Sequence, residues 1–109
     1  MGQIKLTVIY PLPTDVETFE KEYNEVHVPM AVGKLLGKTK IVATKVLQSP
    51  HGTPSVHRIA EIHFPSIAAL EACLASPGGQ ETAAHAVSIS SGGTPSFLVT
   101  EEEVYTFQS

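Results

Sequence analysis

Apolar and polar residues alternate near the start of the chain and predict a strand of about seven residues, from Ile4 to Tyr10. Pro11 and Pro13 follow and end this strand. The next segment, 14–27, places its apolar residues at helical spacing, which predicts a helix with one buried stripe. The residues of that stripe are Val16, Phe19, Tyr23 and Val26.

Both ends of this helix have sequence signals. Thr14 and Glu17 have the spacing of a capping box, in which the threonine hydroxyl accepts a hydrogen bond from the Glu17 N–H and the glutamate side chain returns the contact. Pro29 disfavours the α conformation at Val28, so we expect the helix to end at about His27. His27 is then expected at a helix C-terminus, on the flank of the buried stripe.

The remaining strands are predicted by runs of β-branched and apolar residues. Two such runs flank a turn rich in proline and glycine, which indicates a hairpin, and a flexible loop precedes the last run. The expected strands are 40–48, 56–64 and 97–107, with the turn at 49–54 and the loop at 90–95.

A second helix is expected after the hairpin. Ser66 is a good N-cap, and Pro77, followed by two glycines, breaks the helix. The alanine-rich segment 80–87 predicts a further short helix. The buried face of the second helix is marked by Ile67, Leu70 and Leu74.

The element order β-α-β-β-α-β indicates an α+β fold of the ferredoxin-like class, with one antiparallel sheet and helices on one of its faces. We expect residues 1–109 to form one domain. The second face of each strand mixes polar and apolar residues, which suits neither solvent nor a dry core. Two such sheets packed face to face would form a closed barrel, so we expect a homodimer. The alternation leaves open which strand face points inward.

Composition narrows the class of partner. The net charge is −4 and lysine and arginine do not cluster, which argues against nucleic acid or an anionic membrane surface. Apolar runs stay well below the roughly 18 residues that cross a bilayer, and the N-terminus lacks the features of a signal peptide. Cys73 is the single cysteine, which fits the reducing cytoplasm, so we expect a cytoplasmic protein.

The segment 23–31 has the sequence Tyr-x-x-x-His-x-Pro-Met-Ala. It resembles the signature of the EthD family of dimeric α+β barrels, and the segment 60–66 with Leu70 is similar to a strand-to-helix passage of that family. Three positions depart from the common pattern. Asn24 stands where many relatives have tryptophan, Leu36 where they often have proline, and an acidic residue is replaced near His85.

This resemblance implies a fold without a bound metal or organic cofactor. Proteins with such barrels include lactone isomerases, cofactor-free oxygenases of aromatic polyketides, and dehydratases or decarboxylases of fungal aromatic metabolites, while the founding EthD proteins have an accessory role in ether degradation. The resemblance therefore implies a lyase, isomerase or oxygenase acting on a hydrophobic or aromatic metabolite. A non-catalytic ligand-binding or accessory protein of a degradation or biosynthesis pathway is the alternative.

His27 is the candidate acid and base, because imidazole exchanges protons near neutral pH. Tyr23, one turn earlier, is a candidate to orient His27 or to hold a substrate oxygen. Each of these two residues also has a purely structural interpretation. A histidine at a helix end can cap carbonyls, and an aromatic residue on a buried stripe can simply belong to the core. Further candidates for substrate binding are Tyr10, Met30, Glu61 and His63, the last two if their strand face lines the cavity.

Two effects oppose each other at His27. A helix C-terminus favours the imidazolium by about 0.3 to 1 kcal/mol, whereas burial favours the neutral ring and shifts the pKa by more. We therefore expect a neutral base at pH 7.

A metal site is the other alternative for the histidines. His27, Glu61 and His63 are the conceivable ligands, but no compact ligand motif supports them, and we expect no metal. His51 and His85 are expected to be solvated, and Cys73 is expected to be a buried apolar residue.

Overall fold

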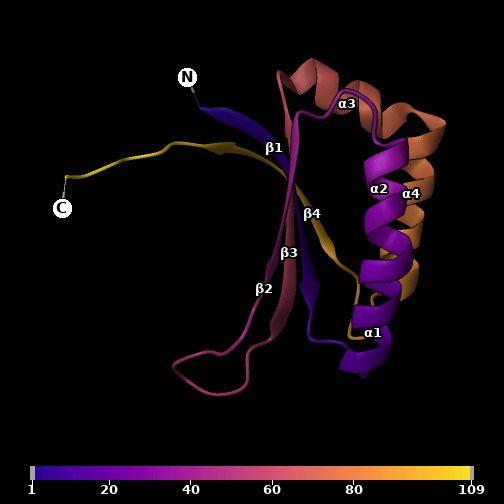
Figure 1. The fold of residues 1–109 in the computed structure, drawn as a ribbon, viewed down its shortest axis with the longest axis vertical. Helices are drawn as coiled ribbons and strands as arrows, with labels where there is room; N and C mark the ends of the chain where they lie inside the picture. Colours follow the sequence, from indigo (N-terminus) through magenta and orange to yellow (C-terminus); the bar gives the residue numbers. More distant parts are fainter. Residues whose placement is uncertain (1, 109) are drawn as a thin grey trace.

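A four-stranded antiparallel sheet forms one layer of the molecule, and the helices form the other (Figure 1). This computed structural model describes residues 2–108, and its strands lie in the order β2-β3-β1-β4. The expected α+β class and ferredoxin-like arrangement are confirmed. The strands are β1 (Gln3–Pro11), β2 (Lys40–Lys45), β3 (Val56–Phe64) and β4 (Ser96–Glu102).

The helical layer consists of two stretches on the same side of the sheet (Figure 1). The first contains α1 (Val16–Glu22), the π turn η1 (Tyr23–His27) and α2 (Val28–Lys34). The second contains α3 (Ile67–Ala75) and α4 (Pro77–Ile89). Among residues 2–108, no helix has both the length and the apolar character needed to cross a membrane.

The prediction that the first helix ends at His27 is wrong. Val28 keeps the α conformation, with φ −61° and ψ −47°, and the chain stays helical to Lys34. A proline inside a regular α-helix removes a hydrogen bond and its ring meets the carbonyl four residues earlier. The π turn before Pro29 relieves this conflict, because the Val28 N–H donates to the Tyr23 carbonyl five residues back.

The predicted capping box is also wrong, because Asp15 rather than Thr14 caps α1. The Asp15 carboxylate accepts a hydrogen bond from the Thr18 N–H at 3.1 Å, and its backbone is extended, as in other cap residues. The N–H of Thr14 donates to the Ser91 hydroxyl in the loop before β4, also at 3.1 Å. Aspartate is at least as good an N-cap as threonine, so the observed cap agrees with local preference.

The proline and glycines at 77–79 begin a helix as well as ending one. Ser76 caps α4 by accepting a hydrogen bond from the Gly79 N–H at 3.0 Å. A Cβ added at Gly79 would lie 1.9 Å from the Cys73 carbonyl oxygen, so glycine lets α3 and α4 meet this closely. Helix α4 is therefore longer than the predicted 80–87, and it packs against η1 and α2.

The core lies between the helices and one face of the sheet. Of the predicted stripe, Phe19 and Tyr23 are buried, whereas Val16 and Val26 are 42% and 40% exposed. The π turn changes the spacing, so that His27 and not Val26 follows Tyr23 on the buried side. Further buried residues are Leu6, Val8, Tyr10, Ala60, Ile62, Phe64, Leu70 and, as expected, Cys73.

The opposite face of the sheet is not covered by other parts of residues 2–108. It carries apolar side chains such as Leu98, which pairs with Thr7 across the β1–β4 ladder and is 45% exposed. It also carries Lys5, whose ammonium donates to the carboxylate of Glu61 and, at 3.2 Å, to that of Glu102. This face is mixed in character, as the alternation predicted.

The last strand is shorter than the predicted 97–107. It ends at Glu102, which pairs with Gln3, the first residue of β1. The residues after β4 lead away from the body of the molecule (Figure 1). Tyr105 and Phe107 in this segment are 75% and 88% exposed.

Candidate active site

A buried histidine, His27, is held between the sheet and α4. Its Nε2 lies 3.2 Å from the Tyr10 hydroxyl of β1, and its Nδ1 lies 2.9 Å from Nδ1 of His85. His27 is 7% exposed and Tyr10 is 1% exposed. Both ring nitrogens of His27 are therefore engaged by protein groups.

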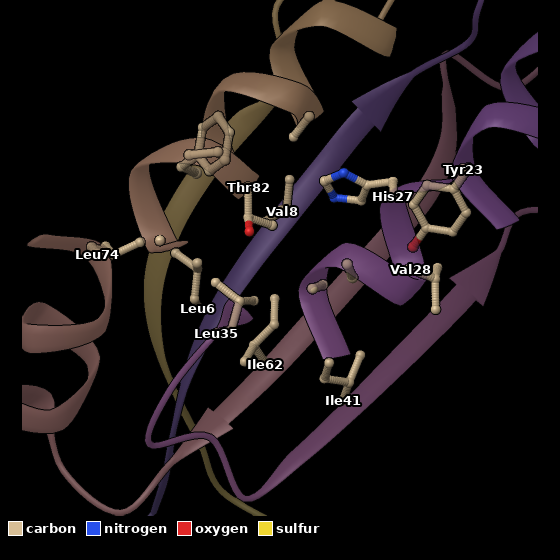
Figure 2. A pocket seen from close by; sticks show the side chains of 16 residues that line it. Leu6, Val8, Tyr23, His27, Val28, Leu35, Ile41, Ile62, Leu74 and Thr82 are labelled. Carbon is tan, nitrogen blue, oxygen red and sulfur yellow. The ribbon is translucent and has the colours of Figure 1, made fainter. Parts of the chain in front are cut away.

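Neighbouring rings fix the orientation of this imidazole. Tyr23 stacks on His27 with the centroids 5.8 Å apart, and His85 lies nearly parallel to it at 5.1 Å. The Tyr23 hydroxyl points toward Val28 and away from the imidazole (Figure 2). Tyr23 thus meets His27 through its ring rather than through its oxygen.

The protonation state of His27 is set mainly by burial. Burial, and secondly the neighbouring His85, lower the pKa of His27 to about 4, so the ring is neutral at pH 7 as predicted. The opposing helix-end effect is absent, because the helical run continues beyond His27. Burial, and secondly Tyr23, raise the pKa of Tyr10, which therefore keeps its proton and donates to Nε2. The remaining proton of neutral His27 then lies on Nδ1, facing His85.

An apolar cavity of about 40 Å³ lies beside His27, between the sheet and the helices (Figure 2). Leu6 and Val8 of β1, Ile62 of β3 and Leu35 form much of its wall. Thr82 also lines it, but its hydroxyl donates to the Gly78 carbonyl at 2.7 Å, which leaves His27 and Tyr23 as polar groups at the wall. Ligand pockets usually measure roughly 300–1,000 Å³, so a metabolite fits only if this cavity widens.

None of the four predicted substrate-binding residues lines this cavity. Ala60 and Ile62 of β3 line it, so Glu61 and His63, at the alternate positions, belong to the opposite face of the sheet. Met30 is not among the lining residues, because Ala31 and Leu35 are the α2 side chains that turn inward. Of these candidates, only Tyr10 is brought to His27.

The three conceivable metal ligands, His27, Glu61 and His63, are not brought together. His27 and the pair of Glu61 and His63 are separated by the sheet, so the three side chains do not converge on one ion. Across residues 2–108, no group of three or more His, Cys, Asp or Glu side chains is placed to hold a metal ion.

His85 is the site residue that sequence reasoning missed. We expected a solvated histidine, but its side chain is 19% exposed and touches His27. The signal was present in α4, where Thr82 is buried and His85, three residues later, lies at the edge of the same helix face. The sequence did not indicate which helix would pack against this edge of α4.

Glu20 on α1 forms hydrogen bonds with two basic side chains, those of His57 and Arg58, near the Tyr23 ring. Arg58 donates through Nε and Nη2 to the two carboxylate oxygens at 3.0 and 2.7 Å, and His57 Nε2 lies 2.9 Å away. The Arg58 guanidinium carbon lies 4.8 Å from the Tyr23 ring centroid. Tyr10 pairs with Arg58 and Pro11 with Val56. His57 is therefore the extra residue of a bulge in β3, and its ring contacts α1.

We expect Glu20→Gln to destabilise the fold in a pH-dependent manner. The Arg58 hydrogen bonds, opposed by burial and supported by His57, lower the pKa of Glu20 from 4.5 to about 2. A lowered carboxyl pKa contributes stability above its ordinary value, and this contribution is lost as pH falls through the folded-state pKa. The expected loss at pH 7 is about 1.5–3 kcal/mol in the free energy of unfolding, measured with urea.

The two proteins should converge in stability as pH falls from 4.5 toward 2. Glu17→Gln is the matched control, because Glu17 is an exposed carboxylate on the same helix. An equal loss at every pH would show that Glu20 acts through packing and not through its charge.

The fold and the buried His27 define the class: an antiparallel ferredoxin-like protein with a neutral histidine at an apolar cavity. The family model named EthD domain matches residues 12–88, a segment that contains both His27 and His85. The chain belongs to the EthD family, and the expected family is confirmed.

A curated relative is similar over nearly all of both chains. It is an uncharacterized 11.0 kDa protein in the thcB-thcC intergenic region of Rhodococcus erythropolis. It is 31% identical over 100 residues, which are 92% of this chain and 96% of the relative.

Solved structures share the fold. An ethyl tert-butyl ether D (EthD) family protein of Bacillus halodurans has a TM-score of 0.85 at 22% identity, covering 93% of this chain and 99% of its own. A dimeric ferredoxin-like protein of unknown function from Jannaschia has a TM-score of 0.64 at 16% identity, covering 93% and 99%. SnoaB, a cofactor-independent oxygenase of Streptomyces nogalater, has a TM-score of 0.65 at 12% identity, covering 96% and 97%. At these identities the likeness concerns the fold alone.

Proposed function

We propose that this protein is an enzyme that moves a proton on a hydrophobic or aromatic small molecule without a cofactor, with His27 as acid and base. The observation that carries this proposal is a neutral imidazole at the wall of an apolar cavity, between Tyr10 and His85. A neutral imidazole accepts a proton at pH 7, and an apolar wall excludes water from the reacting atoms. The description of SnoaB as a cofactor-independent oxygenase supports chemistry of this kind on the fold.

Each nearby group has a task in this proposal. A ligand proton passes to Nε2 of His27 when the Tyr10 hydroxyl turns from that nitrogen toward a ligand oxygen. Tyr10 then donates its hydrogen bond to the oxygen that becomes negative. Tyr23 acts as a positioning residue, because its ring stacks on the imidazole.

The test is proton exchange on a panel of enolisable ketones, lactones and phenols. Each compound is incubated with the protein in D₂O, and deuterium incorporation is followed by mass spectrometry. Incorporation that depends on the protein supports the enzyme. Compounds that bind, as seen by changes in the NMR spectrum of the protein, and that never exchange or change would overturn it.

The second candidate is a binding or accessory protein that holds a metabolite without converting it. One observation favours it: both nitrogens of His27 already have protein partners, and the adjoining cavity is about 40 Å³. Binding without exchange in the same experiment is the result that this candidate predicts.

We also propose that two copies of the chain associate through the uncovered face of the sheet. That face exposes apolar side chains among polar ones, and exposed apolar surface of this kind favours association with another protein surface. The Jannaschia structure with this fold is described as dimeric. A dimer covers the face in the same way in both copies.

Sedimentation equilibrium should therefore give twice 11.6 kDa at micromolar concentration. Leu98→Lys, on the uncovered face, is expected to weaken the dimer. Val32→Lys is the control, because Val32 lies in the helical layer and is already 57% exposed. A stable monomer of the unchanged protein would contradict the assembly.

We place the protein in the cytoplasm. Cys73 is a free, buried thiol whose pKa is raised by burial, which suits a reducing compartment. Cell fractionation tests this location, and recovery with secreted proteins would contradict it.

A further inference from the structure

We propose that His85 is a proton relay that connects the buried His27 with water in the cleft between α1 and α4. The inference rests on the proposed acid–base role of His27 and deepens it. A buried base that accepts a proton from a ligand must also lose it, and the structure offers His85 for that step.

Only one of the two contacts of His27 leads toward solvent. At Nε2 the partner is Tyr10, which is 1% exposed and belongs to the core. At Nδ1 the partner is His85, whose side chain is 19% exposed. Nε2 of His85 lies 3.7 Å from a carboxylate oxygen of Glu22, and the Glu22 side chain is 48% exposed. Exposure therefore rises along the chain His27, His85, Glu22.

The outer end of this chain opens into a polar cleft of about 400 Å³. Phe19 and Ile89 contribute apolar side chains to its lining, and the other lining residues carry hydroxyl groups, carboxylates or, in His85, an imidazole, which all bind water. The polar residues are Thr14, Asp15, Thr18, Glu22, His85, Ser88 and Ser91. His85 thus stands between a polar cleft and the histidine at the apolar cavity.

The hydrogen bonds from Tyr10 through His27 and His85 to Glu22 can all run in one direction, with each group donating to the next. Tyr10 donates to Nε2 of His27, the Nδ1–H of His27 donates to Nδ1 of His85, and the Nε2–H of His85 faces Glu22. When Nε2 of His27 gains a proton, the Nδ1 proton passes to His85. His85 then releases its Nε2 proton to water or Glu22. One proton enters, one leaves, and the charge of the pair is unchanged.

Repulsion drives the transfer outward. The two Nδ1 atoms are 2.9 Å apart, so the rings cannot both be cationic at low cost. Burial and His85 together disfavour a proton that stays on His27. The other titratable groups that face the two histidines come from β1 and α1. They are Tyr10, Asp15 and Glu22, and the carboxylates of Asp15 and Glu22 line the cleft.

The test measures how fast the His27 ring N–H exchanges with water, in protein labelled with ¹⁵N at the histidine rings and at pH 7 without ligand. His85→Phe keeps a flat ring beside His27 and removes the relay. We expect a signal broadened by fast exchange in the unchanged protein. The variant should exchange more slowly, on the order of 100-fold, the lower end of what a positioned acid–base group contributes.

His85→Gln is the second variant, which keeps a polar side chain in case phenylalanine disturbs the helix packing. His51→Phe is the matched control, because His51 lies exposed in the β2–β3 turn, and its exchange rate should equal that of the unchanged protein. Equal rates in the folded His85 variants and the unchanged protein, whether fast or slow, would overturn the relay. Because no substrate is present, this result is independent of whether any ligand is turned over.

Discussion

His27→Gln is expected to slow deuterium exchange into a responsive ligand by about 10²- to 10⁴-fold, the range that a positioned acid–base group contributes. Glutamine occupies similar space and can still hydrogen bond to Tyr10 and His85. It has no atom that accepts a proton near neutral pH, so the loss reports on chemistry. The rate of incorporation per molecule of protein, followed by mass spectrometry, is the measurement.

Two controls separate this effect from damage to the fold. His51→Gln changes an exposed histidine in the β2–β3 turn, and this variant should catalyse deuterium exchange into the ligand at the same rate as the unchanged protein. The mass in solution and the far-ultraviolet circular dichroism of His27→Gln should match those of the unchanged protein. A folded His27→Gln variant with undiminished exchange would remove His27 from the reaction.

Tyr23→Ala is expected to cost about 3–5 kcal/mol in the free energy of unfolding, the range for removing a large buried aromatic ring. The ring is 2% exposed, packs against Phe19 and His27, and lies under the Arg58 guanidinium. Its loss removes all of these contacts and leaves a cavity. Urea denaturation at one protein concentration measures the effect, since a dimer is stabilised by concentration.

Matched variants distinguish the ring of Tyr23 from its hydroxyl. Tyr105→Ala removes the same side chain where it is 75% exposed and should leave stability nearly unchanged. Tyr23→Phe keeps the ring and should retain both stability and exchange, because the hydroxyl points away from the imidazole. A large loss of exchange in Tyr23→Phe with stability intact would instead assign the hydroxyl a direct part in catalysis.

Local signals predicted most of the fold. Strand β3 has the bounds that its β-branched run indicated, and Ser66 caps α3 through the Ala69 N–H as expected. Strand alternation and helix capping depend on residues close in sequence, so they are visible without tertiary contacts. The element order then left the ferredoxin-like arrangement as the economical topology.

Where local signals compete, the structure departed from the prediction. Pro29 indicated a helix end, yet packing of the helical run against the sheet and α4 retains the helix through a π turn. The capping-box spacing indicated Thr14 as the cap, whereas Asp15 caps α1 and Thr14 contacts Ser91. Such conflicts are decided by the total free energy of the fold and not by the stronger local preference.

By itself, the sequence determined the element order, the family signature and the position of His27 one turn beyond the buried Tyr23. Tertiary structure alone decided which partners meet that histidine. Alternation defines two faces of β3 without saying which one the helices cover, and their docking placed Ala60 and Ile62 at the cavity and Glu61 and His63 on the far side. His85 contacts His27 although 58 residues separate them in sequence, because α4 packs against η1. Spacing within an element predicts a face, whereas a contact between elements depends on the position of both.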